Sequence, residues 1–259
     1  MHEKTKIYYL SIIAIVGFSC SPPVETETEE TSANQYTLTP FSPSASFPEA
    51  KITDYSYENG VFSYEVENYT LGEQTPDANI KMCANSGSGQ HIHLIIDTLP
   101  YIAKYETEFE QNIEAGDHYI LSFLSRSYHE SIKTAGAFKA EKVNISDNGT
   151  FESRVDIQEP MLFYSRPKGT YVGEQQTNKV MLDFYLLNTN LGEDLKVEAL
   201  INGESHLIDV WQPYYIEGLP IGDNTITLTL IDGEGKAVDA PLNPVTRTFN
   251  LKEDPAESN

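Results

Sequence analysis

Short runs of alternating apolar and polar residues fill the chain from Ala50 onward, and this pattern most limits the folds open to it. Such alternation has the two-residue period of a β-strand with one buried face. Turn-forming pairs, among them Asn59-Gly60, Asn202-Gly203 and Asp232-Gly233, separate the runs. No long stretch has the period of an amphipathic helix, and the one helical candidate, 130–138, is short. The sequence therefore predicts an all-β fold with strands over 61–66, 92–96, 119–124, 180–187 and 225–231.

The two halves of this region share three motifs in the same order. The first half reads TLGEQT, HLIIDTLPY and IEAGDHYILSFL, and the second reads NLGEDL, HLIDVWQPY and LPIGDNTITLTLI. A repeated order of motifs indicates repeated structural units. We predict two tandem immunoglobulin-like β-sandwich domains at 48–157 and 158–252, followed by a disordered tail at 253–259. A single larger sandwich is the alternative. Trp211, the only tryptophan, is expected to pack in a core or between the domains rather than to hold a ligand.

The N-terminus has the organisation of an export signal. Lys4 and Lys6 precede an apolar stretch at 7–18 that is too short to span a bilayer. The pair Ser19-Cys20 at the end of this stretch resembles a bacterial lipobox. The resemblance implies a lipoprotein signal peptide at 1–19, cleavage before Cys20 and lipidation of its thiol. An ordinary signal peptide or a short N-terminal anchor is the alternative.

The residues that follow Cys20 predict a tether. The segment 20–47 is rich in Pro, Ser, Thr and Glu and has almost no aliphatic residues, so we expect a disordered acidic linker. Its glutamate run at 25–30 resembles the acidic stretch of surface-displayed lipoproteins in flavobacteria and their relatives. These features predict a membrane anchor in the bacterial cell envelope, at the outer membrane.

Charge restricts the partners of the chain. It has 17 Lys and Arg residues against 39 Asp and Glu residues, for a net charge of −22. A field of this sign repels nucleic acid and anionic lipid headgroups, so a role with nucleic acid is excluded. With Cys20 lipidated, Cys83 has no partner for a disulfide within the chain.

Two histidines on one predicted strand suggest a metal site. His91 and His93 are two residues apart, so their side chains point to the same face. Cys83, His118 and His129 are candidates for further ligands, and this donor set suits copper or zinc. The alternative is that these are ordinary histidines on the solvent face of a sandwich strand.

Two short segments resemble the motifs of forkhead-associated (FHA) domains. They are LSRSYHESI at 124–132 and DNGTF at 147–151. The resemblance implies phosphopeptide binding, with Ser125 and Arg126 on the phosphate, His129 supporting the loop and Asn148 on the peptide. The alternative is a simple hairpin turn at Asn148-Gly149 and an Arg126 paired with a carboxylate.

No motif predicts catalysis. The chain has no nucleophile elbow, P-loop, dinucleotide fingerprint or H-E-x-x-H sequence. We therefore expect a non-enzymatic, lipid-anchored binding module that recognises a protein, peptide or glycan and needs no cofactor. Phosphopeptide binding and copper or zinc binding are the two alternatives.

Overall fold

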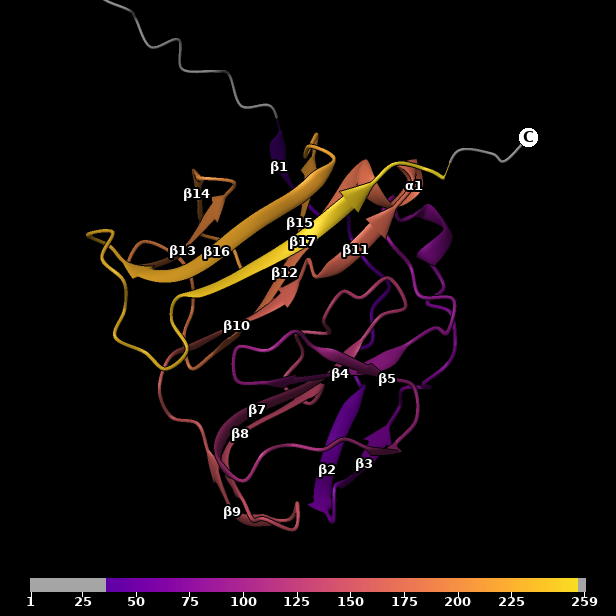
Figure 1. The fold of residues 1–259 in the computed structure, drawn as a ribbon, viewed down its shortest axis with the longest axis vertical. Coiled ribbons are helices and arrows are strands. Elements are labelled where there is room, and N and C mark those ends of the chain that lie inside the picture. The colour runs from indigo at the N-terminus through magenta and orange to yellow at the C-terminus, as the bar shows by residue number, and fades with distance from the viewer. Residues whose placement is uncertain (1–35, 256–259) are drawn as a thin grey trace, which may run out of the picture. The chain divides into compact units, whose positions relative to one another are not determined.

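The computed structural model describes residues 36–255, which form four β-sheets (Figure 1). Lipidation of Cys20 and the signal peptide at 1–19 lie outside the described residues.

Two predicted turns, Asn59-Gly60 and Asn202-Gly203, have positive φ at both residues. This is the conformation of a type I′ hairpin turn, whose twist matches that of the flanking strands. Among residues 36–255, no helix is long and apolar enough to cross a membrane.

The first sandwich consists of a three-stranded and a five-stranded sheet. The small sheet has the order β2-β3-β6 (Lys51–Glu58, Val61–Glu67, Glu108–Glu110). The large sheet has the order β5-β4-β7-β8-β9 (Ile102–Lys104, His91–Ile96, Gly116–Ser125, Phe138–Ile145, Phe151–Asp156). A short 3₁₀ helix, Ala78–Ile80, lies in the connection between β3 and β4. The two sheets share a core that includes Tyr57, Phe62 and Leu94.

The second sandwich has a four-stranded and a five-stranded sheet. The first has the order β1-β15-β12-β10 (Thr37–Pro40, Tyr214–Glu217, Lys179–Leu187, Met161–Arg166). The second has the order β11-β17-β16-β13-β14 (Gly169–Val172, Val245–Lys252, Gly222–Asp232, Leu195–Ile201, Glu204–Ile208). A single helical turn, α1 (Glu174–Thr177), follows β11. The prediction of an all-β fold with tandem immunoglobulin-like sandwiches is confirmed.

The segment predicted as a tether contains a strand. β1 pairs antiparallel with β15, and the residues beside it, Tyr36 and Phe41, are buried. The prediction of disorder through residue 47 is therefore wrong from Tyr36 onward. The strand is held by its backbone pairing with β15 and by the burial of these two aromatic side chains.

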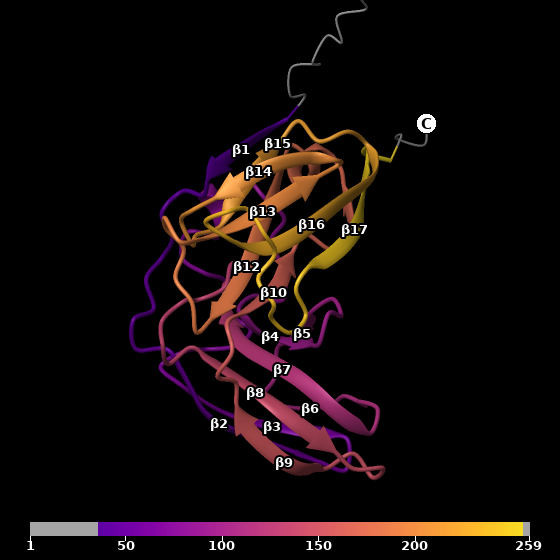
Figure 2. The same ribbon diagram turned by 90° about the vertical axis from the view of Figure 1, so that its left-hand side faces the viewer.

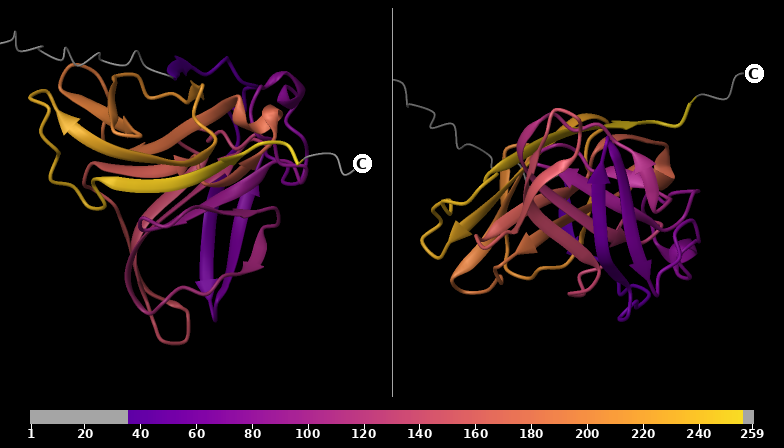
Figure 3. Two further views of the ribbon diagram at one scale, coloured as in Figure 1. Left: turned by 45° about the horizontal axis from the view of Figure 1, so that its top comes forward. Right: turned by 90° about the horizontal axis from the view of Figure 1, so that it is seen from below.

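The large sheet of the first sandwich packs its outer face against the β10–β12 sheet of the second. Strand β4 is buried along its whole length. Ile92 and Leu94 enter the first core, whereas Ile95 belongs to a separate cluster with Phe163 and Tyr185 of the second sandwich. Figures 2 and 3 show β2 and β3 on one side of this junction and β17 on the other. Strands β4, β10 and β12 are therefore covered on both faces, and the polar residues on them are removed from water.

Candidate functional site

The two predicted strand histidines lie at this junction. His91 and His93 are both fully buried on the face of β4 that points toward the second sandwich. Their Nε2 atoms are 2.8 Å apart. The ring of His93 stacks on Tyr101, with centroids 3.6 Å apart and planes 8° apart. The alternative of a solvent-facing histidine pair is therefore wrong, because a second sheet covers this face.

A third histidine joins the pair from a tight loop after β7. The Nδ1 atom of His129 is 3.0 Å from Nε2 of His91. His129 has a φ of 70°, a left-handed conformation that costs energy for a residue other than glycine. The turn is closed by the His129 amide, which donates to the Arg126 carbonyl at 2.8 Å. Histidines 91, 93 and 129 place one nitrogen each within 4.8 Å of one another.

Burial keeps these three imidazoles neutral. It lowers the pKa of His91 to about 4 and lowers the pKa of His93 and of His129 well below the ordinary value. The positive charges of Arg166 and Lys168 lower all three pKa values further. The cluster therefore offers neutral nitrogen donors at physiological pH.

The other predicted metal ligands lie elsewhere. Cys83 packs in an apolar cluster with Phe41 and Tyr128, and burial raises the pKa of its thiol to about 11. His118 lies near the other end of β7, where its Nδ1 atom is 2.7 Å from an Asp97 carboxylate oxygen. Of the three candidates for further ligands, only His129 therefore joins His91 and His93 among the described residues.

The FHA-like residues do not converge either. Ser125 is fully buried at the end of β7. Asn148 follows Ile145, which pairs with Gly116 at the opposite end of the same strand. A ten-residue strand is about 30 Å long, so Asn148 cannot share a ligand with Ser125.

The guanidinium of Arg126 is already occupied. It donates from Nε and from a terminal nitrogen to the Ala45 carbonyl, at 3.0 and 2.7 Å, and lies 3.5 Å from Glu130. The FHA-like motif thus forms a structural loop, and its effect is to hold His129 against the histidine pair.

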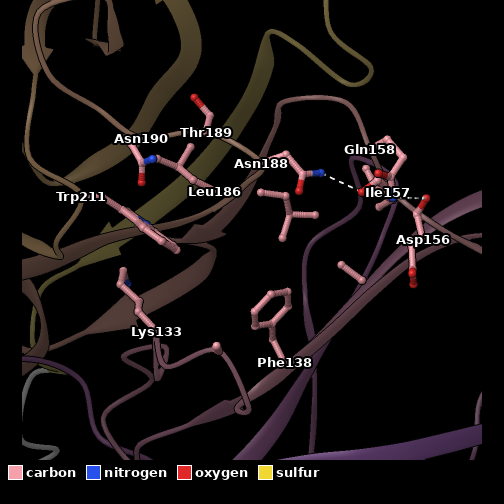
Figure 4. Close-up of a pocket in the computed structure, with 13 residues that line it drawn as sticks. Lys133, Phe138, Asp156, Ile157, Gln158, Leu186, Asn188, Thr189, Asn190 and Trp211 are labelled. Atoms are coloured by element: carbon pink, nitrogen blue, oxygen red, sulfur yellow. Dashed lines mark hydrogen bonds between the residues drawn. The ribbon is translucent and has the colours of Figure 1, made fainter.

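A cleft opens at another part of the junction. It has a volume of about 590 Å³ and is bordered by β8, the end of β9, the end of β12 and the loop between β14 and β15. Figure 4 shows Trp211 and Lys133 on one side, Phe138 below and Asn188 near Gln158 on the other. The residues that line it include Trp211, Phe138, Lys133, Asp156, Gln158, Asn188 and Asn190.

Two sets of contacts hold the residues on the Trp211 side of the cleft. The Trp211 indole N–H donates to the Phe184 carbonyl at 2.9 Å, and its ring meets the Tyr185 ring edge to face. The Lys133 ammonium lies 2.6 Å from Oδ1 of the fully buried Asp183. The expectation that Trp211 packs between the domains agrees with these contacts, but the residue also lines the cleft. The amides of the cleft could not be predicted from the sequence, because nothing in their local pattern separates them from ordinary loop residues.

Comparisons with known proteins give only distant structural likenesses. No family model and no curated protein matches the chain. Fibronectin(III)-like modules of Clostridium thermocellum CbhA are 18% identical, with a TM-score of 0.26, and the match covers 37% of this chain and all of the module. The extracellular domain of a hybrid two component system from B. thetaiotaomicron is 10% identical, with a TM-score of 0.29; the match covers 75% of this chain and 36% of the other.

A third solved structure comes from a glucan utilization locus. SGBP-B of Bacteroides ovatus, solved with a mixed-linkage heptasaccharide, is 12% identical, with a TM-score of 0.19. The match covers 85% of this chain and 48% of the other. At these scores the likenesses support no inference about function, which must be argued from the site.

Proposed function

We propose that this chain is a non-catalytic binding module of the bacterial cell envelope that recognises a neutral glycan in the cleft beside Trp211. The observation that supports the proposal is the combination of an indole with amide side chains in a cleft of about 590 Å³. Ligand sites of this kind combine apolar surface with a few polar groups and measure about 300–1,000 Å³. Aromatic rings pack against the C–H faces of sugars, and amides offer both a donor and an acceptor to sugar hydroxyls.

The charges of the cleft favour a neutral ligand. The ammonium of Lys133 is already paired with Asp183, and Asp156 adds a negative charge at the rim. The chain as a whole has a net charge of −22, which repels polyanions. An uncharged oligosaccharide therefore fits better than an acidic polysaccharide or a phosphopeptide. Among residues 36–255, Lys133 and Asp156 are the ionisable residues that line the cleft, and Lys133 is already paired with Asp183.

A glycan array tests this proposal. The whole chain, purified in detergent, is expected to bind a subset of neutral oligosaccharides and no polyanionic ones. Gln158→Ala and Asn190→Ala remove exposed amides of the cleft. Each variant is expected to weaken binding by about 3- to 10-fold, because a hydrogen bond contributes about 0.5–1.5 kcal/mol.

The matched control for the glycan array is Gln111→Ala. It removes an amide beside β6, outside the cleft, and should leave affinity unchanged. Binding that is equally strong in the two cleft variants and in this control would contradict the assignment of the cleft.

We further propose that Cys20 carries the lipid that anchors the chain, as the lipobox-like sequence suggests. Cys20→Ala is expected to move the protein from the membrane fraction to the soluble fraction, because two or more acyl chains are needed for stable anchoring. Cys83→Ala, at the buried cysteine, should remain in the membrane fraction. Fractionation followed by immunoblotting measures both, and an unchanged membrane fraction for Cys20→Ala would refute the anchor.

A further inference from the structure

We propose that His91, His93 and His129 form a binding site for one transition-metal ion, and that the geometry and charge of the site favour monovalent copper. The site is separate from the glycan cleft, and none of the three histidines lines that cleft.

The orientation of His91 points a lone pair into the cluster. Its Nδ1–H donates to the Gly89 carbonyl at 2.8 Å, which leaves Nε2 unprotonated in the neutral ring. A metal-binding histidine typically has this kind of partner, a backbone carbonyl that fixes the tautomer and the ring orientation. Nε2 of His91 then faces Nε2 of His93 and Nδ1 of His129.

The spacing of the three nitrogens is close to that of a metal site. Metal–nitrogen bonds of about 2.0–2.1 Å place nitrogens about 3.3–3.6 Å apart in tetrahedral or trigonal coordination. The two shorter separations are 2.8 and 3.0 Å, so binding requires an outward movement of roughly half an ångström. His129 is the partly exposed member and lies on a loop, so it can move away from His91. The 2.8 Å separation between His91 and His93 widens only if their side chains rotate on β4.

The surroundings favour a monovalent ion over a divalent one. No carboxylate is part of the cluster in the described residues, and Arg166 and Lys168 place positive charges near it. Arg166 lies 3.4 Å from the Tyr101 hydroxyl, and Lys168 donates to the Tyr101 carbonyl at 2.7 Å. Repulsion from these cations scales with the charge of the bound ion, so it is half as large for Cu(I) as for Zn(II). Imidazole nitrogens bind both copper and zinc. The choice between the two metals therefore depends on the positive charges of Arg166 and Lys168 and on the small number of ligands, three histidines.

Competition titrations with the whole chain in detergent test the site. Under reducing, anaerobic conditions, a Cu(I) chelator is expected to report one tightly bound equivalent, and Zn(II) is expected to bind more weakly. His129→Asn keeps a residue that tolerates the positive φ but removes one imidazole. It should weaken Cu(I) binding by at least about 100-fold, because even outer-shell partners of a ligand are worth about 10–100-fold.

Two controls separate this site from other copper ligands. His118→Asn and Cys83→Ala change candidate ligands outside the cluster and should retain wild-type affinity. Thermal unfolding followed by the emission of Trp211 checks that each variant is folded. Absence of stoichiometric metal binding, unchanged affinity in folded His129→Asn, or loss of affinity in Cys83→Ala would overturn the site. Tighter binding of Zn(II) than of Cu(I) would overturn the choice of ion. Glycan binding by His129→Asn should be unchanged, so failure of either proposal is recognised independently of the other.

Discussion

Replacing Lys133 with methionine is expected to lower the free energy of unfolding by about 3–5 kcal/mol. The substitution leaves the Asp183 carboxylate, which is fully buried, without the ammonium that lies 2.6 Å away. The Ser131 amide still donates to Asp183 at 3.0 Å, but one neutral hydrogen bond does not offset a buried charge. Urea denaturation followed by the emission of Trp211 measures the effect as a shift in midpoint.

Lys142→Met is the matched control for this ion pair. Lys142 lies 3.4 Å from Asp117, but the two side chains are 44% and 60% exposed. An exposed pair contributes about 0–1 kcal/mol, so this variant should have nearly the wild-type midpoint. The double variant Lys133→Met/Asp183→Leu should recover much of the lost stability, because it leaves no unpaired charge. Equal midpoints for Lys133→Met and Lys142→Met would contradict the structural account of the junction.

Acidification from pH 6.5 to pH 4 is expected to lower the free energy of unfolding of the metal-free chain by about 3 kcal/mol through His91 alone. The unfolded chain takes up a proton at His91 as the pH falls below 6.5, whereas the folded chain does so only near pH 4. Stability is therefore complete above pH 6.5 and is lost as the pH falls through this window. His93 and His129 act in the same direction, because burial lowers their pKa values as well.

Urea denaturation at a series of pH values measures this dependence. His91→Gln removes one titrating group and should give a shallower loss of stability between pH 6.5 and pH 4. Ser165→Ala is the control, since it changes a buried side chain 3.5 Å from His93 without changing a titrating group. A loss of stability that is equally steep in His91→Gln would mean that other groups, such as carboxylates, dominate the acid response.

The sandwiches could be predicted because alternation and turn pairs are local properties of the sequence. The packing of one sandwich against the other could not be predicted from the sequence. His91 and His93 occupy alternate positions on β4, a pattern that is typical of a solvated face, and Asp183 is a single charged residue within the apolar run of β12. Nothing in the spacing distinguishes a face covered by water from one covered by a second sheet, because the partner residues come from distant parts of the chain.

Only the local part of the histidine site could be predicted from the sequence. The shared direction of His91 and His93 follows from the two-residue period alone and is correct. The third histidine depends on how the loop after β7 turns back, which strand patterns do not specify. His118 was a plausible ligand on composition, but its register opposite Val143 places it near the far end of β7.

The motifs shared by the two halves of the sequence also do not predict which strands of the two sandwiches are equivalent. Gly116-Asp117 and Gly222-Asp223 begin β7 and β16, each of which lies between two neighbouring strands of a five-stranded sheet. The repeated His-Leu-Ile motif does not occupy equivalent places, since His91 lies on the internal strand β4 and His206 on the edge strand β14. The order of the shared motifs therefore does not align the strands of the two sandwiches.

The emission of Trp211 tests the central claim most directly, because the chain has a single tryptophan and it lines the cleft. Titration of the whole chain with the oligosaccharide selected on the array is expected to change this emission saturably, with the same affinity that calorimetry gives. Calorimetric binding without any change in emission would place the ligand elsewhere, and absence of glycan binding would contradict the proposed function itself.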